Sequence, residues 1–382
     1  MIYLDHNATT TMRPGILAAM LPYLEGPSGN PTSVHGFGRR ARQGLDLARR
    51  QVAQLFGVHE NLVCFTSGAT EANNLAILGV SGMRNQPGHA ITSRIEHPSV
   101  LAAFDLLAQQ GHRVSFLNVD GAGRVNPEEL RTTLQPDTFL VSVMHANNET
   151  GVIQPIHTLG EMCREAGVLF HTDAVQSVGR IPWQYETVPA DLISLSAHKL
   201  GGPMGVGALI MERTMPLQPR IVGGGQERGR RAGTPNLSGI VGLGAVAQIL
   251  SHHPQEEIAT MTRLRNHMEG ELMANIPGLF LFSSEAERIP NTSMVGIEQI
   301  HGETLVMNLD LAGIGISSGA ACASGKGEGS HVLGAMGVSA ALTQSAVRIS
   351  LGWNTQMFEV ERLIQQLISI VARLRGGSGA MV

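Results

Sequence analysis

The chain has 382 residues, of which 43% are hydrophobic and 15% are charged, and its formal net charge at pH 7 is -4. These values predict a globular protein of two domains and give no reason to expect nucleic acid as a direct partner. No apolar run is long enough to span a bilayer, and residues 1–7 lack the basic and apolar regions of a signal peptide. We therefore expect a cytoplasmic protein without a membrane contact.

Helices and strands alternate along the first part of the chain. Short apolar runs predict strands at 62–65, 90–92, 114–119, 139–145, 169–172 and 191–194, and a strand that runs back at 207–212. Helical spacing of apolar residues is found between these runs, at 39–57, from the turn at 66–71 to residue 77, and at 98–110, 127–134 and 158–166. This order predicts a mostly parallel α/β sheet with helices on both faces.

The pattern changes after a long helical region, which covers 239–250 and continues over 256–275. Strands are expected at 292–297, 314–316 and 346–350, and helices at 302–312 and 356–374. We interpret this part as a second, smaller α+β domain. The predicted division is a large domain of residues 15–256 and a small domain formed by 1–14 and 257–382, which carries Cys322.

Two neighbouring predicted strands end in chemically useful residues, Asp173 and Lys199. An apolar segment that ends in an acid, followed by one that ends in a lysine, is typical of a site for pyridoxal phosphate (PLP). The lysine holds the aldehyde as a Schiff base, and the carboxylate keeps the pyridine nitrogen protonated. A lysine at a strand end is by itself usually a surface residue, so the prediction depends on the residues around it.

A phosphate site is predicted beside this lysine. The turn at 67–71 leads from a strand into a helix, where backbone N–H groups and the Thr70 hydroxyl suit a phosphate. With Glu71 in the first turn it is equally a routine helix start. Ser196 and His198 add two donors next to Lys199, and together these groups form a credible phosphate cup.

Other polar residues follow the predicted strands. Gln176 is placed to donate to the ring oxygen of PLP, and His97 either stacks on the ring or only begins a helix. The segment 145–151 ends a further strand with polar side chains, where open α/β sheets bind ligands. Cys64 and Cys163 lie in apolar elements and are expected to be inert, whereas Cys322 stands in a Gly/Ser/Ala loop and is available for chemistry.

These segments together resemble the group I cysteine desulfurases, the NifS/IscS type, which are fold-type I PLP enzymes of the class V aminotransferase superfamily. The resemblance runs nearly end to end, over 3–10, 29–33, 66–74, 147–151, 171–178, 196–205, 223–234 and 317–324. The Ser-Ser-Gly-x-x-Cys pattern at 317–322 separates this group from its relatives. One departure is Ala323, where the family usually has Thr.

The resemblance implies a large domain with a mostly parallel seven-stranded sheet between helices, and removal of sulfur from L-cysteine to give L-alanine. Lys199 would form the Schiff base and remove the α-proton. Cys322 would carry the sulfur as a persulfide to an acceptor protein such as an iron–sulfur scaffold. Cys322 is also a candidate transient ligand of an iron–sulfur cluster, and no intrinsic metal is expected.

The resemblance also implies roles for the remaining residues. Asp173 would pair with the pyridine nitrogen, Gln176 with the ring oxygen, and His97 would stack on the ring. The residues expected to hold the phosphate are Ala69, Thr70, Ser196 and His198, with Thr234 reaching the phosphate of the partner subunit in a homodimer. Asn148 and Arg348 would bind the substrate carboxylate, Arg348 through a two-pronged ion pair, with Asn30 nearby.

Two other interpretations remain at this stage. A selenocysteine lyase or another class V aminotransferase-type PLP enzyme would keep Lys199 and Asp173 without the same dependence on Cys322. A non-enzymatic scaffold would be expected to have lost one of these three residues, and all three are present.

Overall fold

The computed structural model describes residues 1–27, 29–182, 188–252, 254–319 and 329–377. Its larger sheet has seven strands in the order β2-β8-β7-β6-β5-β3-β4. The strands are β2 (Val63–Thr66), β3 (His89–Ser93), β4 (Arg113–Leu117), β5 (Thr138–Ser142), β6 (Leu169–Asp173), β7 (Leu192–Ser196) and β8 (Gly207–Met211). Only β8 runs against its neighbours within this sheet, so the mostly parallel sheet and its reversed strand are confirmed.

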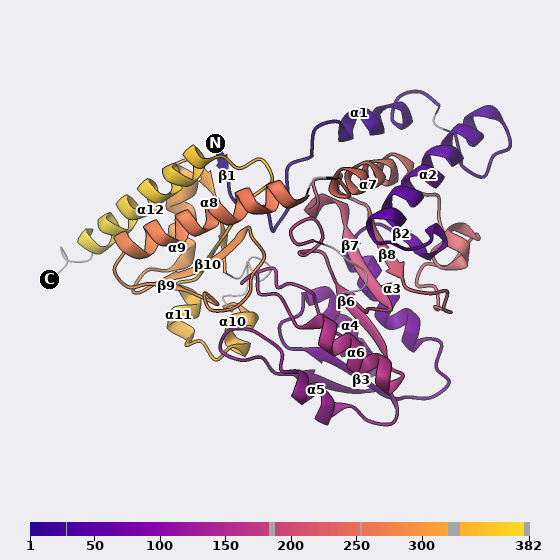
Figure 1. Ribbon diagram of the computed structural model, residues 1–382, viewed down its shortest axis with the longest axis horizontal. Coiled ribbons are helices and arrows are strands. Elements are labelled where there is room, and N and C mark those ends of the chain that lie inside the picture. Colours follow the sequence, from indigo (N-terminus) through magenta and orange to yellow (C-terminus); the bar gives the residue numbers. More distant parts are fainter. Residues whose placement is uncertain (28, 183–187, 253, 320–328, 378–382) are drawn as a thin grey trace.

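Helices cover both faces of this sheet (Figure 1). On one face, buried residues of α2 (Gly36–Leu55), α5 (Pro127–Thr133), α6 (Ile156–Ala166) and α7 (Leu237–Leu250) share a core with the strands. On the other face, α3 (Ala69–Ser81) and α4 (Pro98–Gln109) form a second core. The buried strands read as continuous apolar runs because they are covered from both sides.

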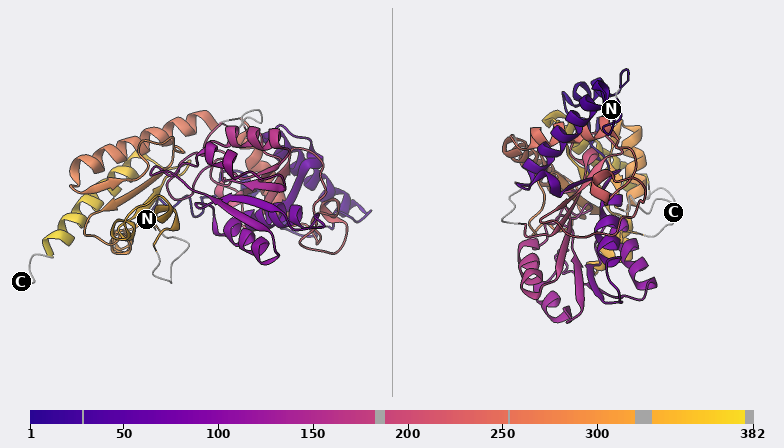
Figure 2. Two further views of the ribbon diagram at one scale, coloured as in Figure 1. Left: turned by 90° about the horizontal axis from the view of Figure 1, so that it is seen from below. Right: turned by 90° about the vertical axis from the view of Figure 1, so that its right-hand side faces the viewer.

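A smaller sheet lies beside the larger one, and the molecule is elongated (Figure 2). Its strands are β12 (Ser317–Ser318), β13 (Val347–Ser350), β10 (Thr292–Ile297) and β9 (Leu279–Leu281), paired antiparallel in that order. The helices packed with it are α8 (Pro254–Asn275), α9 (Gly302–Leu311) and α12 (Met357–Gly377), and α8 lies alongside α12 (Figure 1). Two short helices, α10 (His331–Ala335) and α11 (Ala340–Gln344), complete this part.

The N-terminal segment connects the two sheets. β1 (Ile2–Tyr3) pairs in parallel with β11 (Ile314–Gly315) beside the small sheet. Further along, the N–H of Thr10 bonds the carbonyl of His198, and the N–H of Arg13 bonds that of Gly201, both in the large unit. The short helix α1 (Ile16–Met20) follows. Residues between β1 and α1 therefore cross the junction between the two units.

Several expected boundaries were wrong. Of the strand expected at 314–316, only β11 (Ile314–Gly315) is formed, because the chain changes partner strand at Ile316 and continues as β12. The strand expected at 139–145 ends at Ser142, although the N–H groups of Val143 and His145 still bond carbonyls of β6. The sequence pattern also missed β1, β9, β12, α1, α10 and α11, each too short to show a period.

The domain division at 256/257 stays a prediction. It agrees with the position of α8, whose Leu264, Met268 and Leu272 are buried in the core of the small unit. Among the described residues, no helix is both long and apolar enough to cross a membrane.

Candidate active site

A pocket of about 690 Å³ opens where the carboxyl ends of β2, β6 and β7 meet the N-terminal segment. The carboxyl edge of an open α/β sheet is the usual place for a ligand. Most of the predicted site residues line it, namely Ala69, Thr70, His97, Asn148, Asp173, Gln176, Ser196, His198, Lys199 and Arg348. Asn30 and Thr234 do not line this pocket, and Cys322 lies outside the described residues.

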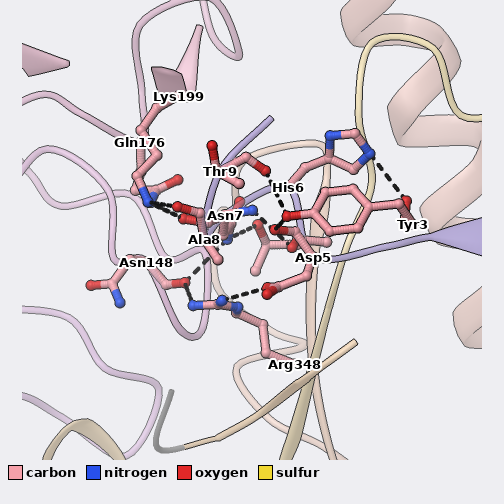
Figure 3. Close-up of polar contacts among 12 residues, drawn as sticks. Tyr3, Asp5, His6, Asn7, Ala8, Thr9, Asn148, Gln176, Lys199 and Arg348 are labelled. Carbon is pink, nitrogen blue, oxygen red and sulfur yellow. Dashed lines mark hydrogen bonds and ion pairs between the residues drawn. The ribbon is translucent and has the colours of Figure 1, made fainter. Parts of the chain in front are cut away.

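Lys199 enters the pocket from the turn that follows β7. Its Nζ donates hydrogen bonds to the carbonyl oxygens of Asn7 and Ala8, the latter at 2.6 Å (Figure 3). The neighbouring His198 ring contacts the Thr9 hydroxyl, with 3.1 Å between Nδ1 and Oγ1. Burial and the Lys199 charge lower the pKa of His198 to about 4, so the ring is neutral at pH 7.

Asp173 ends β6 and is held on both carboxylate oxygens. Oδ2 accepts a hydrogen bond from Asn73 Nδ2 at 2.8 Å, and Oδ1 accepts one from the Val175 N–H at 3.0 Å. Asn73 also donates to the Ser99 hydroxyl at 2.9 Å, and its side chain is fully buried in α3. Sequence reasoning missed Asn73. Its place in an apolar helix indicates a buried amide that needs partners, but does not say which residues those partners are.

The residues beside Lys199 fit a phosphate. α3 begins at Ala69, and the first N–H groups of a helix have no intrahelical acceptor. Thr70, Ser196 and His198 add side-chain groups around the same space. A Cβ atom at Gly207 would lie 2.5 Å from the Leu195 carbonyl oxygen and 2.8 Å from the Gly68 backbone, so a glycine is required where β8 approaches this turn.

His97 is both the N-cap of α4 and a wall of the pocket. Its Nδ1 accepts a hydrogen bond from the Ser99 N–H at 3.1 Å, which leaves Nε2 to carry the proton. Burial is the main factor that lowers the pKa of His97, and the Lys199 charge acts in the same direction. The His97 ring is therefore neutral. Because His97 begins α4 and also lines the pocket, the two interpretations from the sequence, a helix start and a stacking residue, are compatible.

Arg348 lies on β13 and is almost fully buried, with 3% of its surface exposed. Its Nη1 donates to the Asn148 carbonyl at 3.0 Å, and its Nη2 forms an ion pair with Asp5 at 2.7 Å (Figure 3). Nε has no hydrogen-bond partner among the described residues. The pocket therefore contains a cation, Arg348, whose counter-ion in this structure is the carboxylate of Asp5.

Two predicted residues lie elsewhere in the single chain. Asn30 is exposed, and its Oδ1 accepts hydrogen bonds from the N–H and hydroxyl of Thr32. Thr234 is also exposed and lines a separate pocket of about 90 Å³. Ser67 and Gly205 line both this pocket and the larger one. Thr234 therefore lies next to the turn at 67–71 (the phosphate-type turn), but it does not line the larger pocket.

The two described cysteines are buried and unpaired, as the sequence predicted. Burial raises the pKa of Cys64 to about 12, and burial likewise raises the pKa of Cys163 to about 12. Neither thiol supplies a thiolate at neutral pH, and nucleophilic sulfur chemistry requires the thiolate.

A lysine and a buried carboxylate at adjacent strand ends, beside a helix N-terminus with phosphate-binding character, define the site of an enzyme class that binds an aldehyde cofactor through lysine. This chain belongs to the class-V aminotransferase family, whose model matches residues 2–363.

Named relatives cover almost the whole chain. It is 45% identical over 376 residues to a cysteine desulfurase of Cereibacter sphaeroides, a match that covers 98% of this chain and 96% of that protein. It is 42% identical over 374 residues to a cysteine desulfurase of Trichormus azollae, covering 98% and 94%. A solved structure described as a NifS-like protein aligns with a TM-score of 0.91 and 37% identity, covering 97% of this chain and 99% of that one.

Proposed function

We propose that this chain is a PLP-dependent cysteine desulfurase, which converts L-cysteine to L-alanine and transfers the sulfur to Cys322. The observation that carries the proposal is the meeting of Lys199, Asp173 and the turn at Thr70 in one pocket, in a chain whose named relatives are cysteine desulfurases over nearly their full length. The NifS-like fold and the class-V family support the same conclusion.

The residues present fit PLP. Lys199 would hold the aldehyde carbon, Asp173 the pyridine nitrogen, and Thr70, Ser196 and His198 the phosphate. When bound, PLP joins the substrate amino group and withdraws electrons from the bonds at its α-carbon. Asp173 suits its role because Asn73 and the Val175 N–H fix the orientation of its carboxylate.

The chain's own groups then bind the substrate and move a proton. The L-cysteine carboxylate takes the place of Asp5 at Arg348, because both anions require the same guanidinium. The side chain of Lys199, in leaving the carbonyls of Asn7 and Ala8, becomes the base that removes the α-proton.

Sulfur transfer is assigned to Cys322. Its thiolate attacks the substrate sulfur, so that an S–S bond forms while the bond from that sulfur to the β-carbon breaks. The electron pair of the broken bond stays on the substrate, whose β-carbon takes up a proton. A proton returned to the α-carbon, from which Lys199 removed one, then gives alanine. Cys322 is left with the extra sulfur as a persulfide, and a second protein must accept it.

The setting of the reaction is part of the proposal. A homodimer is supported by the exposed apolar side chains Leu17, Leu21, Phe37 and Val222 and by the position of Thr234 beside the phosphate-type turn. The sulfur acceptor is proposed to be an iron–sulfur scaffold protein. Unpaired buried cysteines are consistent with a reducing compartment such as the cytoplasm.

The test measures alanine formed from L-cysteine in the presence of a thiol reductant. Cys322→Ala should reduce alanine formation at least about 100-fold, because the nucleophile is lost. Cys163→Ala is the matched control and should keep the wild-type rate, since that thiol is buried and protonated. A Cys322→Ala enzyme that forms alanine at the wild-type rate would instead favour a lyase mechanism.

A further inference from the structure

Arg180 is a buried cation that the proposed reaction does not use. Arg180 lies in the turns that follow β6, where its N–H donates to the carbonyl of Ser177. Only 6% of the Arg180 surface is exposed. Its guanidinium donates from Nη1 to the backbone and side-chain oxygens of Gln176, and from Nη2 to the carbonyl of His6 at 3.3 Å. Gln176 lines the pocket and Arg180 does not, so Arg180 contacts Gln176 from outside the pocket lining.

These contacts determine which way the Gln176 amide faces. A guanidinium has only donors, so the side-chain group of Gln176 that faces Arg180 must be the oxygen Oε1. The amide nitrogen Nε2 is then directed to the other side, where it donates to the Asn7 carbonyl at 3.1 Å. Lys199 Nζ donates to the same carbonyl oxygen, so the Gln176 amide nitrogen and the lysine nitrogen converge (Figure 3).

Arg180 has no compensating acid among the residues that the structure describes. Burial and the nearby Arg348 charge lower the pKa of Arg180 to about 9, so it is still charged at pH 7. A buried cation without a counter-ion costs free energy that an apolar side chain of similar volume would not cost. Hydrogen bonds to the carbonyls of His6 and Gln176 offset part of this cost, so fold stability alone is a weak reason for a charged donor at this position.

We infer that Arg180 is a positioning residue that locks the Gln176 amide with its nitrogen toward the pocket, so that Gln176 can only donate to the ring oxygen of PLP. This inference rests on the proposed function. Without Arg180, the amide is free to rotate and present its oxygen, which would repel an anionic ring oxygen. A donor at that oxygen favours its anionic form and disfavours a proton on the adjacent lysine-bound nitrogen.

The experiment is a pH titration of the visible absorption of the PLP-loaded enzyme, followed in wild type, Arg180→Met, Arg180→Lys and Gln176→Ala. Arg180→Met should raise the pH midpoint by roughly one unit, the size of one lost charge-stabilising hydrogen bond. Arg180→Lys keeps a donor-only cation and should restore most of the wild-type midpoint. Gln176→Ala should also raise the midpoint.

The double variant Arg180→Met with Gln176→Ala separates positioning from a direct charge effect. If Arg180 acts through Gln176, the double variant has the midpoint of Gln176→Ala alone. Additive shifts, or an unchanged midpoint in Arg180→Met, would overturn the inference. Melting temperatures of the PLP-free variants show whether each is folded, and Arg180→Lys provides the comparison if Arg180→Met is not. Failure of the wild type to bind PLP at Lys199 would instead overturn the proposed function and this inference with it.

Discussion

Lys199 Nζ and Gln176 Nε2 share one acceptor, the carbonyl oxygen of Asn7. These two side-chain donors of the pocket therefore converge on one backbone oxygen. The N-terminal segment supplies that oxygen and the Ala8 carbonyl oxygen, which Lys199 also binds. Binding of a cofactor and a substrate has to replace these oxygens, and the Asp5 carboxylate at Arg348, with groups of the same polarity.

The site residues at strand ends could be predicted from the sequence, whereas the residues that form hydrogen bonds with site residues could not. Asp173 and Lys199 follow apolar runs, so their place at the sheet edge follows from the pattern. Asn73, Arg180 and Asp5 contact the site through other side chains or across hundreds of residues. Such partners depend on the three-dimensional packing, which no periodicity in the chain encodes.

Glu96, which precedes His97, gives a prediction about pH. Burial raises the pKa of Glu96 to about 8, well above its unfolded value of 4.5. The folded state then binds one more proton than the unfolded state between these two pH values, so the free energy of unfolding falls as pH rises through that window. Glu96→Gln should remove this contribution, about 1.4 kcal/mol per pH unit.

Denaturant titrations at several pH values across the window measure the effect. Glu128→Gln on α5 is the control, because its side chain is 69% exposed and its substitution should leave the pH dependence unchanged. An identical pH dependence for wild type and Glu96→Gln would show that Glu96 is ionised in the folded protein.

Among the helices and strands, the reversed strand β8 limits the space available to the phosphate-type turn at 67–71. β8 pairs with both β2 and β7, and Gly207 faces the Gly68 backbone too closely for a side chain. The sequence predicted the strand from a short apolar run, and the expected reversed direction is confirmed. It could not predict β12 or the change of partner strand at Ile316, since two-residue strands carry no period.

Gly207→Ala should weaken PLP binding at least about tenfold, which corresponds to 1.4 kcal/mol. The added methyl group must push β8 away from the turn at Gly68, and overpacking of this kind typically costs 1–3 kcal/mol. Gly270→Ala on α8 is the matched control, because no atom lies within 4 Å of a Cβ built there. PLP titration followed by absorbance provides the measurement, and equal affinities for Gly207→Ala and wild type would contradict this account of β8.

For the molecule as a whole, two residues of the predicted site, Thr234 and Asn30, do not line the main pocket of the single chain. Thr234 is exposed and lines the smaller pocket, and Asn30 is exposed on a turn. The sequence pattern gives no means to assign a residue to its own subunit or to a partner, because both choices have the same sequence. A homodimer in which Thr234 serves the partner's phosphate remains a prediction.

Mixed dimers test this prediction. A Lys199→Ala subunit paired with a Thr234→Ala subunit should restore about one intact site, because the second subunit keeps Lys199 and receives Thr234 from the first. Pairing Lys199→Ala with Ser196→Ala is the control and should restore none, since Ser196 and Lys199 line the pocket of the same chain. Equal activity of the two mixtures, or an active monomer in sedimentation, would exclude a shared site.

The proposed reaction leaves the sulfur of L-cysteine on one thiol of this chain, that of Cys322. Mass spectrometry of the wild-type protein after incubation with L-cysteine, followed by peptide mapping, tests it most directly. We expect one added sulfur per chain, carried by the peptide that contains Cys322. None is expected on Cys64 or Cys163, because burial raises the pKa of each thiol to about 12. Added sulfur on either buried cysteine, or alanine formation with no sulfur bound to Cys322, would contradict it.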